Sequence, residues 1–296
     1  MTSSLKKAIE EMFARQLSSW PLAYNNFQAL QQVEEKTFHC NGYNIRVQHN
    51  PARAVSSGAK VDAKSIAARP CFLCEQNRPK EQDCVRWNNY DILVNPFPIF
   101  HNHLTIAWQQ HQPQQLRSHL SDMIDLAQML DGYTIFYNGP QCGASAPDHM
   151  HFQAGENDGI PLVQDFEWLQ QQVEPEPISN ALLYRIGGPL YQRTVWVVCG
   201  ETPEEVMKGF DHLIPDCSTN EPMMNVLCNT NGNTIQLFVF PRKAFRPWQY
   251  SAEGNDRLMV SPATVELSGV VITPRKEDFE KITLDDVYSI FQQITL

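Results

Sequence analysis

Two histidines and a glutamine stand at every second position of the stretch PDHMHFQAG, residues 147 to 155. Successive side chains of a strand point to opposite faces, so His149, His151 and Gln153 are expected to share one face. A neutral imidazole is a good nucleophile toward phosphorus when a partner fixes its tautomer. A neighbouring amide can donate a hydrogen bond to a phosphoryl oxygen. The spacing therefore indicates phosphoryl chemistry on a strand predicted over residues 149–154.

A glycine-containing segment, YNGPQCGASAP, precedes this strand and begins near Asn138. Glycines such as Gly143 let backbone N–H groups approach an anion closely, and the Ser145 hydroxyl can donate as well. We interpret the segment as a phosphate cradle that leads into the histidine strand.

The histidine strand belongs to one of two segments that share an order of elements. The first has strands at 103–108, 133–138 and 149–154, with a helical pattern from about Gln112 to Leu130. The second has strands at 194–199, 224–229 and 234–240, with a helix beginning at TPEEVMKGF. Both segments read strand–helix–strand–strand, which predicts a duplicated α+β fold with a mainly antiparallel sheet.

The second copy lacks the histidines. Laying HMHFQ over IQLFV places Ile235, Leu237 and Val239 where the first copy has its polar residues. One copy would then bury apolar side chains on the face where the other displays polar ones. Buried polar groups are costly unless they are paired, so the comparison favours a functional interpretation of the histidines over a structural one.

Composition excludes several classes of function. The net charge of −10 over 296 residues argues against a nucleic-acid polymer as partner. Residues 43–80, however, carry seven basic and two acidic side chains, which suits a small anionic ligand; a solvated loop is the alternative. The sequence contains no run of about 18 apolar residues, the length needed to span a membrane. The eight cysteines lack the density of a disulfide scaffold, which favours a cytoplasmic location.

The histidine strand and its cradle resemble the active-site signature of the histidine-triad superfamily. The match is closest to the branch with glutamine in the third place, which includes galactose-1-phosphate uridylyltransferase, the dinucleoside-tetraphosphate phosphorylases and the GDP-hexose phosphorylases. The upstream NPFPIFHNHLTIAWQQH resembles the same family through His103 and His111. The C-terminal LFVFPRKAF and SPATVELSGVVITPRKEDFEKI look most like the GDP-hexose phosphorylases.

The resemblance implies a nucleotidyltransferase or phosphorylase with a histidine-triad-like fold. His151 would attack the α-phosphorus of a nucleoside diphosphate sugar or dinucleoside polyphosphate, and Gln153 would hydrogen-bond a non-bridging oxygen of the covalent intermediate. Phosphate or a sugar phosphate would then accept the nucleotidyl group. The expected catalytic residues are His149, His151, Gln153 and Ser145, and the expected substrate-binding residues are Arg53, Asn95, Asn138 and Gly143.

One departure from the family pattern concerns Asp148. Family members usually have two residues between the serine and the first histidine, whereas three follow Ser145 here. Asp148 is expected either to tune the imidazoles electrostatically or to turn the chain into the strand.

A second candidate site is the pair Cys71 and Cys74 in RPCFLCEQNRP, at a spacing that zinc favours in a reducing compartment. Some uridylyltransferase-like proteins complete such a pair with histidines that correspond to His111 and His149. The resemblance thus implies a structural zinc site that supports the strand carrying His151. A redox Cys-x-x-Cys pair and two ordinary buried cysteines are the alternatives.

Three functions stay open at this point: a covalent nucleotidyltransferase or phosphorylase, a nucleotide hydrolase, and a zinc-stabilised nucleotide-binding protein without turnover. The glutamine at position 153 favours transfer over hydrolysis. We expect an N-terminal half over 1–180, with the active-site strand and the zinc site, and a degenerate C-terminal half over 181–296. A homodimer is a further expectation, because uridylyltransferase-like relatives build their sites across a dimer.

Overall fold

The structure is a computed structural model that describes residues 2–59, 61–214 and 221–296. Its largest element is a ten-stranded sheet in which the paired neighbours are antiparallel. Across the sheet the strands follow the order β3 (Cys84–Trp87), β4 (Tyr90–Val94), β5 (Leu104–Trp108), β7 (His151–Glu156), β6 (Tyr133–Asn138), β11 (Met224–Asn231), β12 (Thr234–Pro241), β10 (Val195–Gly200), β9 (Ala181–Ile186) and β8 (Glu176–Ile178).

The strand order is symmetric about the neighbours β6 and β11. On one side β5, β7 and β6 lie in succession, and on the other β10, β12 and β11 do the same. Helix α5 (Leu120–Met129) precedes β6, and α8 (Pro203–Leu213) precedes β11. The predicted α+β class and its duplicated strand–helix–strand–strand units are confirmed. The predicted boundary after residue 180 falls between β8 and β9, inside one continuous sheet.

Local signals fixed two of the elements. Thr202 and Glu205 form the expected capping box at the start of α8, with the threonine hydroxyl accepting from the Glu205 N–H and the carboxylate accepting from the Thr202 N–H. The turn TNGN joins β11 to β12, and Gly232 has φ +60°, which glycine adopts at little cost.

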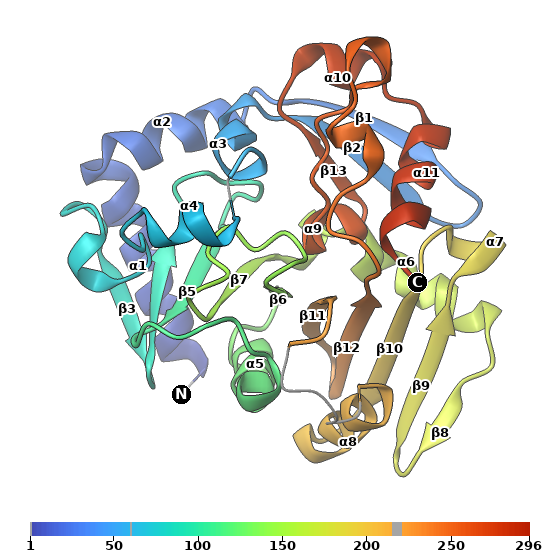
Figure 1. Cartoon of the computed structure of the whole chain (residues 1–296). Coiled ribbons are helices and arrows are strands. Elements are labelled where there is room, and N and C mark those ends of the chain that lie inside the picture. Colours follow the sequence, from blue (N-terminus) through green and yellow to red (C-terminus); the bar gives the residue numbers. More distant parts are fainter. Residues whose placement is uncertain (1, 60, 215–220) are drawn as a thin grey trace.

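Two hydrophobic layers cover the sheet. Helices α1 (Thr2–Ser19), α5 and α8 bury their apolar sides on one face. Helices α6 (Pro161–Leu169) and α11 (Leu284–Ile294) cover the other face together with a small sheet. Figure 1 shows that small sheet beside α10 and α11, on the side of the molecule away from α1 and α2. The small sheet consists of β1 (Glu34–His39), β2 (Asn44–His49) and β13 (Val270–Thr273), in that order. The remaining α-helices are α2 (Pro21–Leu30), α3 (Ala54–Ser57), α4 (Ala63–Ala67), α7 (Gly188–Tyr191), α9 (Thr264–Leu267) and α10 (Lys276–Lys281).

The helix predicted from Gln112 to Leu130 is shorter than expected, because α5 begins only at Leu120. The residues before it run alongside the histidine segment instead: the Met150 N–H donates to the Gln112 carbonyl at 2.6 Å, and the Gln114 N–H donates to the Pro147 carbonyl at 3.1 Å. These backbone groups are satisfied between segments, so they are not available to a helix.

The predicted alignment of the histidine strand, β7, with β12 is wrong by one residue. Phe136 and Leu227 lie opposite each other where the two units meet, and they pair with Gln153 and Phe238 respectively. Phe238 therefore occupies the place of Gln153, and Gln236 occupies that of His151. Ile235, Leu237 and Val239 instead lie on the sheet face covered by α1, α5 and α8, in the same hydrophobic layer as Met150, Phe152 and Ala154. Sequence overlay missed this because both faces of β12 are buried and largely apolar.

The strand predicted at 149–154 begins two residues later, at His151. His149 lies in a turn, where its N–H donates to the Ala146 carbonyl at 3.1 Å. The three residues between Ser145 and His149 provide that turn. Among the residues that the structure describes, no helix has the length and hydropathy needed to cross a membrane.

Candidate active site

One cavity of about 420 Å³ brings together residues that lie far apart in the sequence, from Trp20 to Glu266. Its wall includes seven of the predicted site residues: Arg53, Asn95, Asn138, Gly143, Ser145, His151 and Gln153. The eighth, His149, belongs to the adjacent group of cysteines and histidines described below. The cavity therefore collects the predicted phosphate cradle, the histidine and the glutamine in one place.

His151 is 4 % exposed and has its ring oriented by the chain itself. Its Nδ1 lies 2.8 Å from the His149 carbonyl oxygen, which can only accept, so Nδ1 carries the proton. Nε2 is then the nitrogen with a free lone pair. Burial lowers the pKa of His151 to about 4, so the ring is neutral at pH 7. A neutral imidazole with a defined tautomer and a cavity beside it is the arrangement that nucleophilic attack requires.

The amide of Gln153 is oriented by two neighbours. His103 accepts a hydrogen bond at Nδ1 from the Ile99 N–H, so its Nε2 donates to Gln153 Oε1 at 3.0 Å. Asn95 Nδ2 approaches the same oxygen at 3.4 Å. With Oε1 used as acceptor, the NH₂ group of Gln153 is the end that serves the cavity. Gln153 is thus arranged to donate to an anionic oxygen.

His103 gives the first testable prediction. Burial and, to a smaller extent, the positive charge of Arg53 together lower the pKa of His103 to about 3. Unfolded histidine has a pKa of about 6.5, so the unfolded chain binds the proton first and stability falls as the pH drops below about 6.5. From pH 7 to pH 4 we expect the free energy of unfolding to decrease by about 3 kcal/mol more in the wild type than in a His103→Gln variant.

Urea titrations at several pH values measure this difference. Replacement of the exposed His212 by Gln is the matched control, and its curve should stay closer to that of the wild type than to that of His103→Gln. Parallel curves for His103→Gln and the wild type would contradict the neutral, buried state of His103.

Gln114, which the sequence did not single out, bridges the two strands at the site. Its side chain accepts from the His151 N–H at 2.8 Å and donates to the carbonyls of His151 and Asn138 at 3.2 and 3.1 Å. It is 1 % exposed. The bridge satisfies backbone groups where β6 and β7 separate beyond their last paired residues. No pattern could have revealed it, because its partners are backbone atoms.

Replacing Gln114 by Ala leaves three buried backbone groups without this partner. Each such loss costs about 1–3 kcal/mol, and we expect the free energy of unfolding to fall by about 3 kcal/mol in total. Denaturant unfolding measures the change, with exposed Gln110→Ala as a control expected within about 0.5 kcal/mol of the wild type. A loss below about 1 kcal/mol would show that the bridge is not needed at the start of β7.

The phosphate-cradle segment is fastened to the C-terminal half. Asn138 Oδ1 accepts hydrogen bonds from Asn225 Nδ2 and from the N–H and hydroxyl of Thr264, at 2.6 to 2.9 Å. Gly143 has φ +95°, and a Cβ there would lie 2.6 Å from the Ala263 Cβ. A larger residue at 143 would therefore push α9 away from the cradle.

Two arginines supply positive charge to the cavity. Arg53 lines it and donates to the Phe97 carbonyl at 2.8 Å, and Arg69 lines it and donates to the Ser145 carbonyl at 2.8 Å. Both come from the basic segment 43–80 noted in the sequence, of which Lys60 lies outside the described residues. Asn95 also lines the cavity, and both ends of its amide bond protein groups: Nδ2 donates to Thr105 Oγ1, and Oδ1 accepts from the Phe97 N–H.

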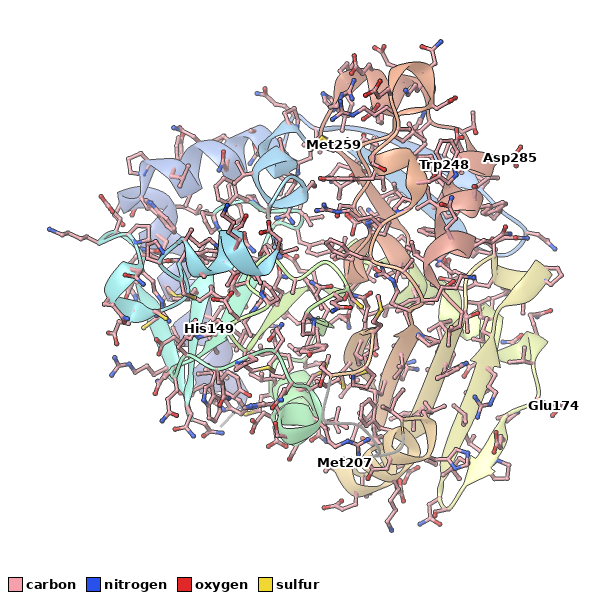
Figure 2. The ribbon with its side chains drawn as sticks, in the orientation of Figure 1. His149, Glu174, Met207, Trp248, Met259 and Asp285 are labelled. Atoms are coloured by element: carbon pink, nitrogen blue, oxygen red, sulfur yellow. The ribbon has the colours of Figure 1, made fainter. Side chains whose placement is uncertain are left out.

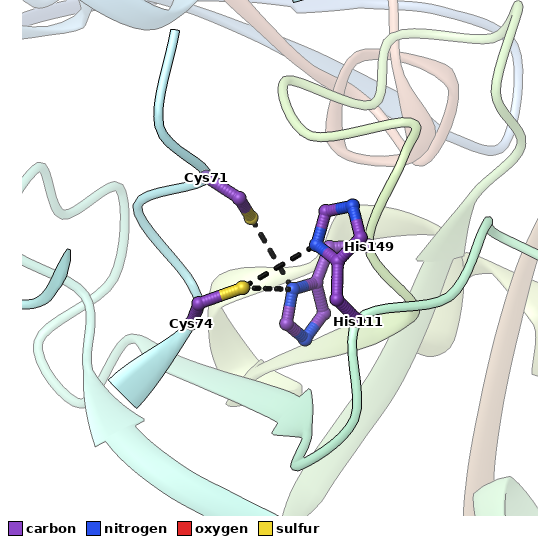
Figure 3. A group of neighbouring side chains, drawn as sticks. All are labelled: Cys71, Cys74, His111 and His149. Atoms are coloured by element: carbon purple, nitrogen blue, oxygen red, sulfur yellow. Dashed lines mark hydrogen bonds between the residues drawn. The ribbon is translucent and has the colours of Figure 1, made fainter. Parts of the chain in front are cut away.

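Beside the cavity, Cys71, Cys74, His111 and His149 place one ligand atom each within 4.8 Å of one another (Figure 3). Cys71 Sγ lies 3.2 Å from His149 Nδ1, and Cys74 Sγ lies 3.3 Å from His111 Nδ1. Two thiols and two imidazoles converging in this way form a group that could hold a metal ion. The set leaves no open ligand position in a tetrahedral site, which is typical of structural metals.

The groups that contact His149 and His111 from outside support a metal at this group. His149, which is labelled in Figure 2, is buried, and its Nε2 donates to the Trp108 carbonyl at 2.7 Å, which leaves Nδ1 unprotonated toward the cysteines. Asp148 Oδ2 lies 3.6 Å from His111 Nε2, and its Oδ1 lies 3.7 Å from Arg69. Asp148 therefore acts electrostatically between a ligand of this group and an arginine of the cavity, besides occupying the turn before β7.

Comparison with known proteins supports the fold. Residues 12–156 match the family model of a domain of unknown function, DUF4922, and residues 200–296 match the GDPGP1-like C-terminal domain. Yeast Ap4A phosphorylase Apa2 in complex with Ap4A is 18% identical, covers 99% of this chain and 97% of its own, and superimposes with a TM-score of 0.63. The chain has the fold of yeast Apa2. The fold that the resemblance implied is thereby confirmed.

Two further structures of yeast Apa2 agree. The complex with AMP is 18% identical over 94% of both chains, with a TM-score of 0.60. The form named without a ligand is 16% identical over 93% of this chain and 96% of that one, with a TM-score of 0.59. No protein of curated function matches the sequence. At these identities the likeness establishes the fold alone.

Proposed function

We propose that the protein is a nucleotidyl-transferring phosphorylase that acts on a nucleoside diphosphate sugar or a dinucleoside polyphosphate. The observation that carries the proposal is the state of His151: its Nδ1–H bonds the His149 carbonyl, and the ring lines the cavity. The donor end of Gln153 and the charges of Arg53 and Arg69 suit the phosphates of such a substrate.

In the first step His151 Nε2 donates its lone pair to the α-phosphorus. An N–P bond forms, and the bond from that phosphorus to the bridging oxygen breaks, so a sugar 1-phosphate or nucleoside polyphosphate leaves with the electron pair. The Nδ1 proton stays on the ring, and the His149 carbonyl stabilises the cation that results. Gln153 would hold a non-bridging oxygen, and Ser145 and the Asn138 amide would support the phosphate from the cradle.

In the second step an oxygen of inorganic phosphate or of a sugar phosphate attacks the same phosphorus. The new P–O bond forms as the N–P bond breaks, and His151 regains its lone pair. Positioning and charge stabilisation account for most of the catalysis in phosphoryl transfer, and the cavity supplies both.

Apolar side chains complete the proposed substrate site. Trp20, Leu22, Val55, Phe72 and Phe97 line the same cavity, and Leu22, Val55 and Phe72 are large exposed hydrophobic residues. A nucleobase presents two apolar faces that such side chains can cover. This combination of an apolar wall and cationic groups supports a nucleotide as ligand.

Zinc is the metal we propose for the Cys71, Cys74, His111 and His149 group. When bound, zinc would supply a fixed tetrahedral link between the Cys-x-x-Cys turn and the start of β7. It would hold His149, whose carbonyl orients His151. The free thiols at Cys71 and Cys74 suit a reducing compartment, and we propose a cytoplasmic location.

A donor panel tests the proposed function. UDP-, GDP- and ADP-sugars and dinucleoside polyphosphates are incubated with the purified protein, with and without phosphate, and products are separated by chromatography. We expect a nucleoside diphosphate and a sugar 1-phosphate, or two nucleotides, only when phosphate is present. Turnover at the same rate in its absence would favour hydrolysis instead.

A further inference from the structure

A carboxylate lies in the proposed nucleotide site and has no role in the steps above. Glu266, on α9, is 7 % exposed and lines the same cavity as His151. A negative charge in a cavity that binds phosphates repels the ligand unless it contacts an uncharged part of it that carries hydrogen-bond donors. The position of Glu266 therefore needs an explanation in terms of the ligand.

Only one oxygen of this carboxylate is used by the protein. Oε2 accepts a hydrogen bond from the Ala263 N–H at 2.8 Å. Oε1 accepts none from the residues that the structure describes, and yet it is not among the fully enclosed side-chain atoms that lack a partner. Oε1 is therefore open to the cavity that Glu266 lines, and it is available as an acceptor.

The surroundings hold Glu266 in place. Thr264, two residues earlier, donates through its N–H and its hydroxyl to Asn138 Oδ1, so α9 is fixed to the strand next to β7. Burial raises the pKa of Glu266, and the charges of Arg53 and Arg242 oppose this rise by attracting the carboxylate. Arg53 lines the cavity as well. Arg242 donates to backbone carbonyls and to Asn225, and it is not available to a ligand. The result is an oriented acceptor close to a cation that suits phosphate.

We propose that Glu266 Oε1 accepts a hydrogen bond from a hydroxyl group of a sugar ring of the substrate, next to the phosphate held by Arg53. This assignment rests on the proposed function and deepens it. A sugar joined to a phosphate carries uncharged donors one or two carbons away from it, which matches a carboxylate beside an arginine. The hexose of a nucleotide sugar and the ribose of the nucleotide are the two sources of such a hydroxyl.

The test measures binding, so it does not depend on turnover. In a His151→Asn background the donor stays intact, and titration calorimetry gives Kd for a nucleoside diphosphate hexose with and without Glu266→Gln. The glutamine keeps an oxygen for the Ala263 N–H but loses the charge. We expect Kd to rise about 10–100-fold, because a site built around a substrate hydroxyl discriminates strongly once one partner is changed. Exposed Glu253→Gln is the matched control and should leave Kd unchanged.

Deoxy substrates identify the hydroxyl. Removing the bonded hydroxyl should weaken binding to the Glu266-containing protein about 10-fold or more and add little in the Glu266→Gln variant. A hexose hydroxyl is indicated if the effect appears with deoxyhexoses, and a ribose hydroxyl if it appears with deoxyribose. Additive losses for every deoxy substrate, or an unchanged Kd in Glu266→Gln, would overturn the inference.

Two safeguards keep the test decisive. If Glu266→Gln does not fold, the deoxy series on the Glu266-containing protein decides alone. The inference is contradicted if no single hydroxyl can be found whose removal raises Kd more than about 3-fold. If none of the nucleotide sugars and dinucleoside polyphosphates binds, the proposed function and this inference are contradicted together. Binding that is normal but indifferent to Glu266 contradicts only the latter.

Discussion

Replacing His151 by Asn is expected to abolish the covalent intermediate and to lower turnover by about 10⁴-fold or more, the order of loss seen when a covalent enzyme loses its nucleophile. Asparagine can still donate to the His149 carbonyl from the same position, but its amide nitrogen has no lone pair for phosphorus. A donor labelled with ³²P at the α-phosphorus should therefore label the wild type through an acid-labile bond and leave the variant unlabelled.

Substrate binding separates chemistry from folding in this experiment. Because the cavity wall is otherwise intact, Kd for the donor should change by less than about 10-fold in His151→Asn, and the thermal unfolding midpoint should stay within a few degrees. The same substitution at the exposed His212 is the control and should label like the wild type. Labelling of His151→Asn at the wild-type level would disprove the assignment of His151 as the nucleophile.

Replacing Cys74 by Ser is expected to release the proposed zinc and to destabilise the whole site. Its Sγ lies within 3.5 Å of both His111 Nδ1 and His149 Nδ1, so it is the thiol shared by the two imidazoles. Loss of a structural metal removes a link that stabilises only the folded state, and we expect at least about 4 kcal/mol of lost stability. For a chain of this size that corresponds to roughly 8 °C in Tm.

Metal analysis and calorimetry measure this outcome. Elemental analysis should find one zinc per wild-type chain and much less in Cys74→Ser, and chelation of the wild type should lower its Tm by a similar amount. Cys84→Ser, at a partly buried cysteine on β3 outside the group, is the control that should keep its zinc. Equal metal content in both variants would show that these four residues do not hold the ion.

The sequence alone determined the class of the fold and singled out residues that the structure brings together in the cavity and in the cysteine–histidine group. Alternation around His151, a capping box at Thr202 and the hairpin TNGN are local patterns, and local backbone geometry enforces them wherever they occur. The repeat was visible because each copy buries the same kinds of strands and helix. Cys71 and Cys74 were visible because a short spacing constrains where two thiols can lie.

Only the tertiary structure decided how these groups work. The tautomer of His151 depends on the His149 carbonyl, the direction of the Gln153 amide depends on His103, and the start of β7 depends on Gln114. Each of these contacts joins a side chain either to a backbone atom, which every residue has, or to a residue far away in the sequence. No spacing rule predicts such a contact. The one-residue error in aligning β7 with β12 has the same origin: with both faces of β12 buried, hydrophobicity does not fix the register, and the hydrogen-bonded pairing with β11 does.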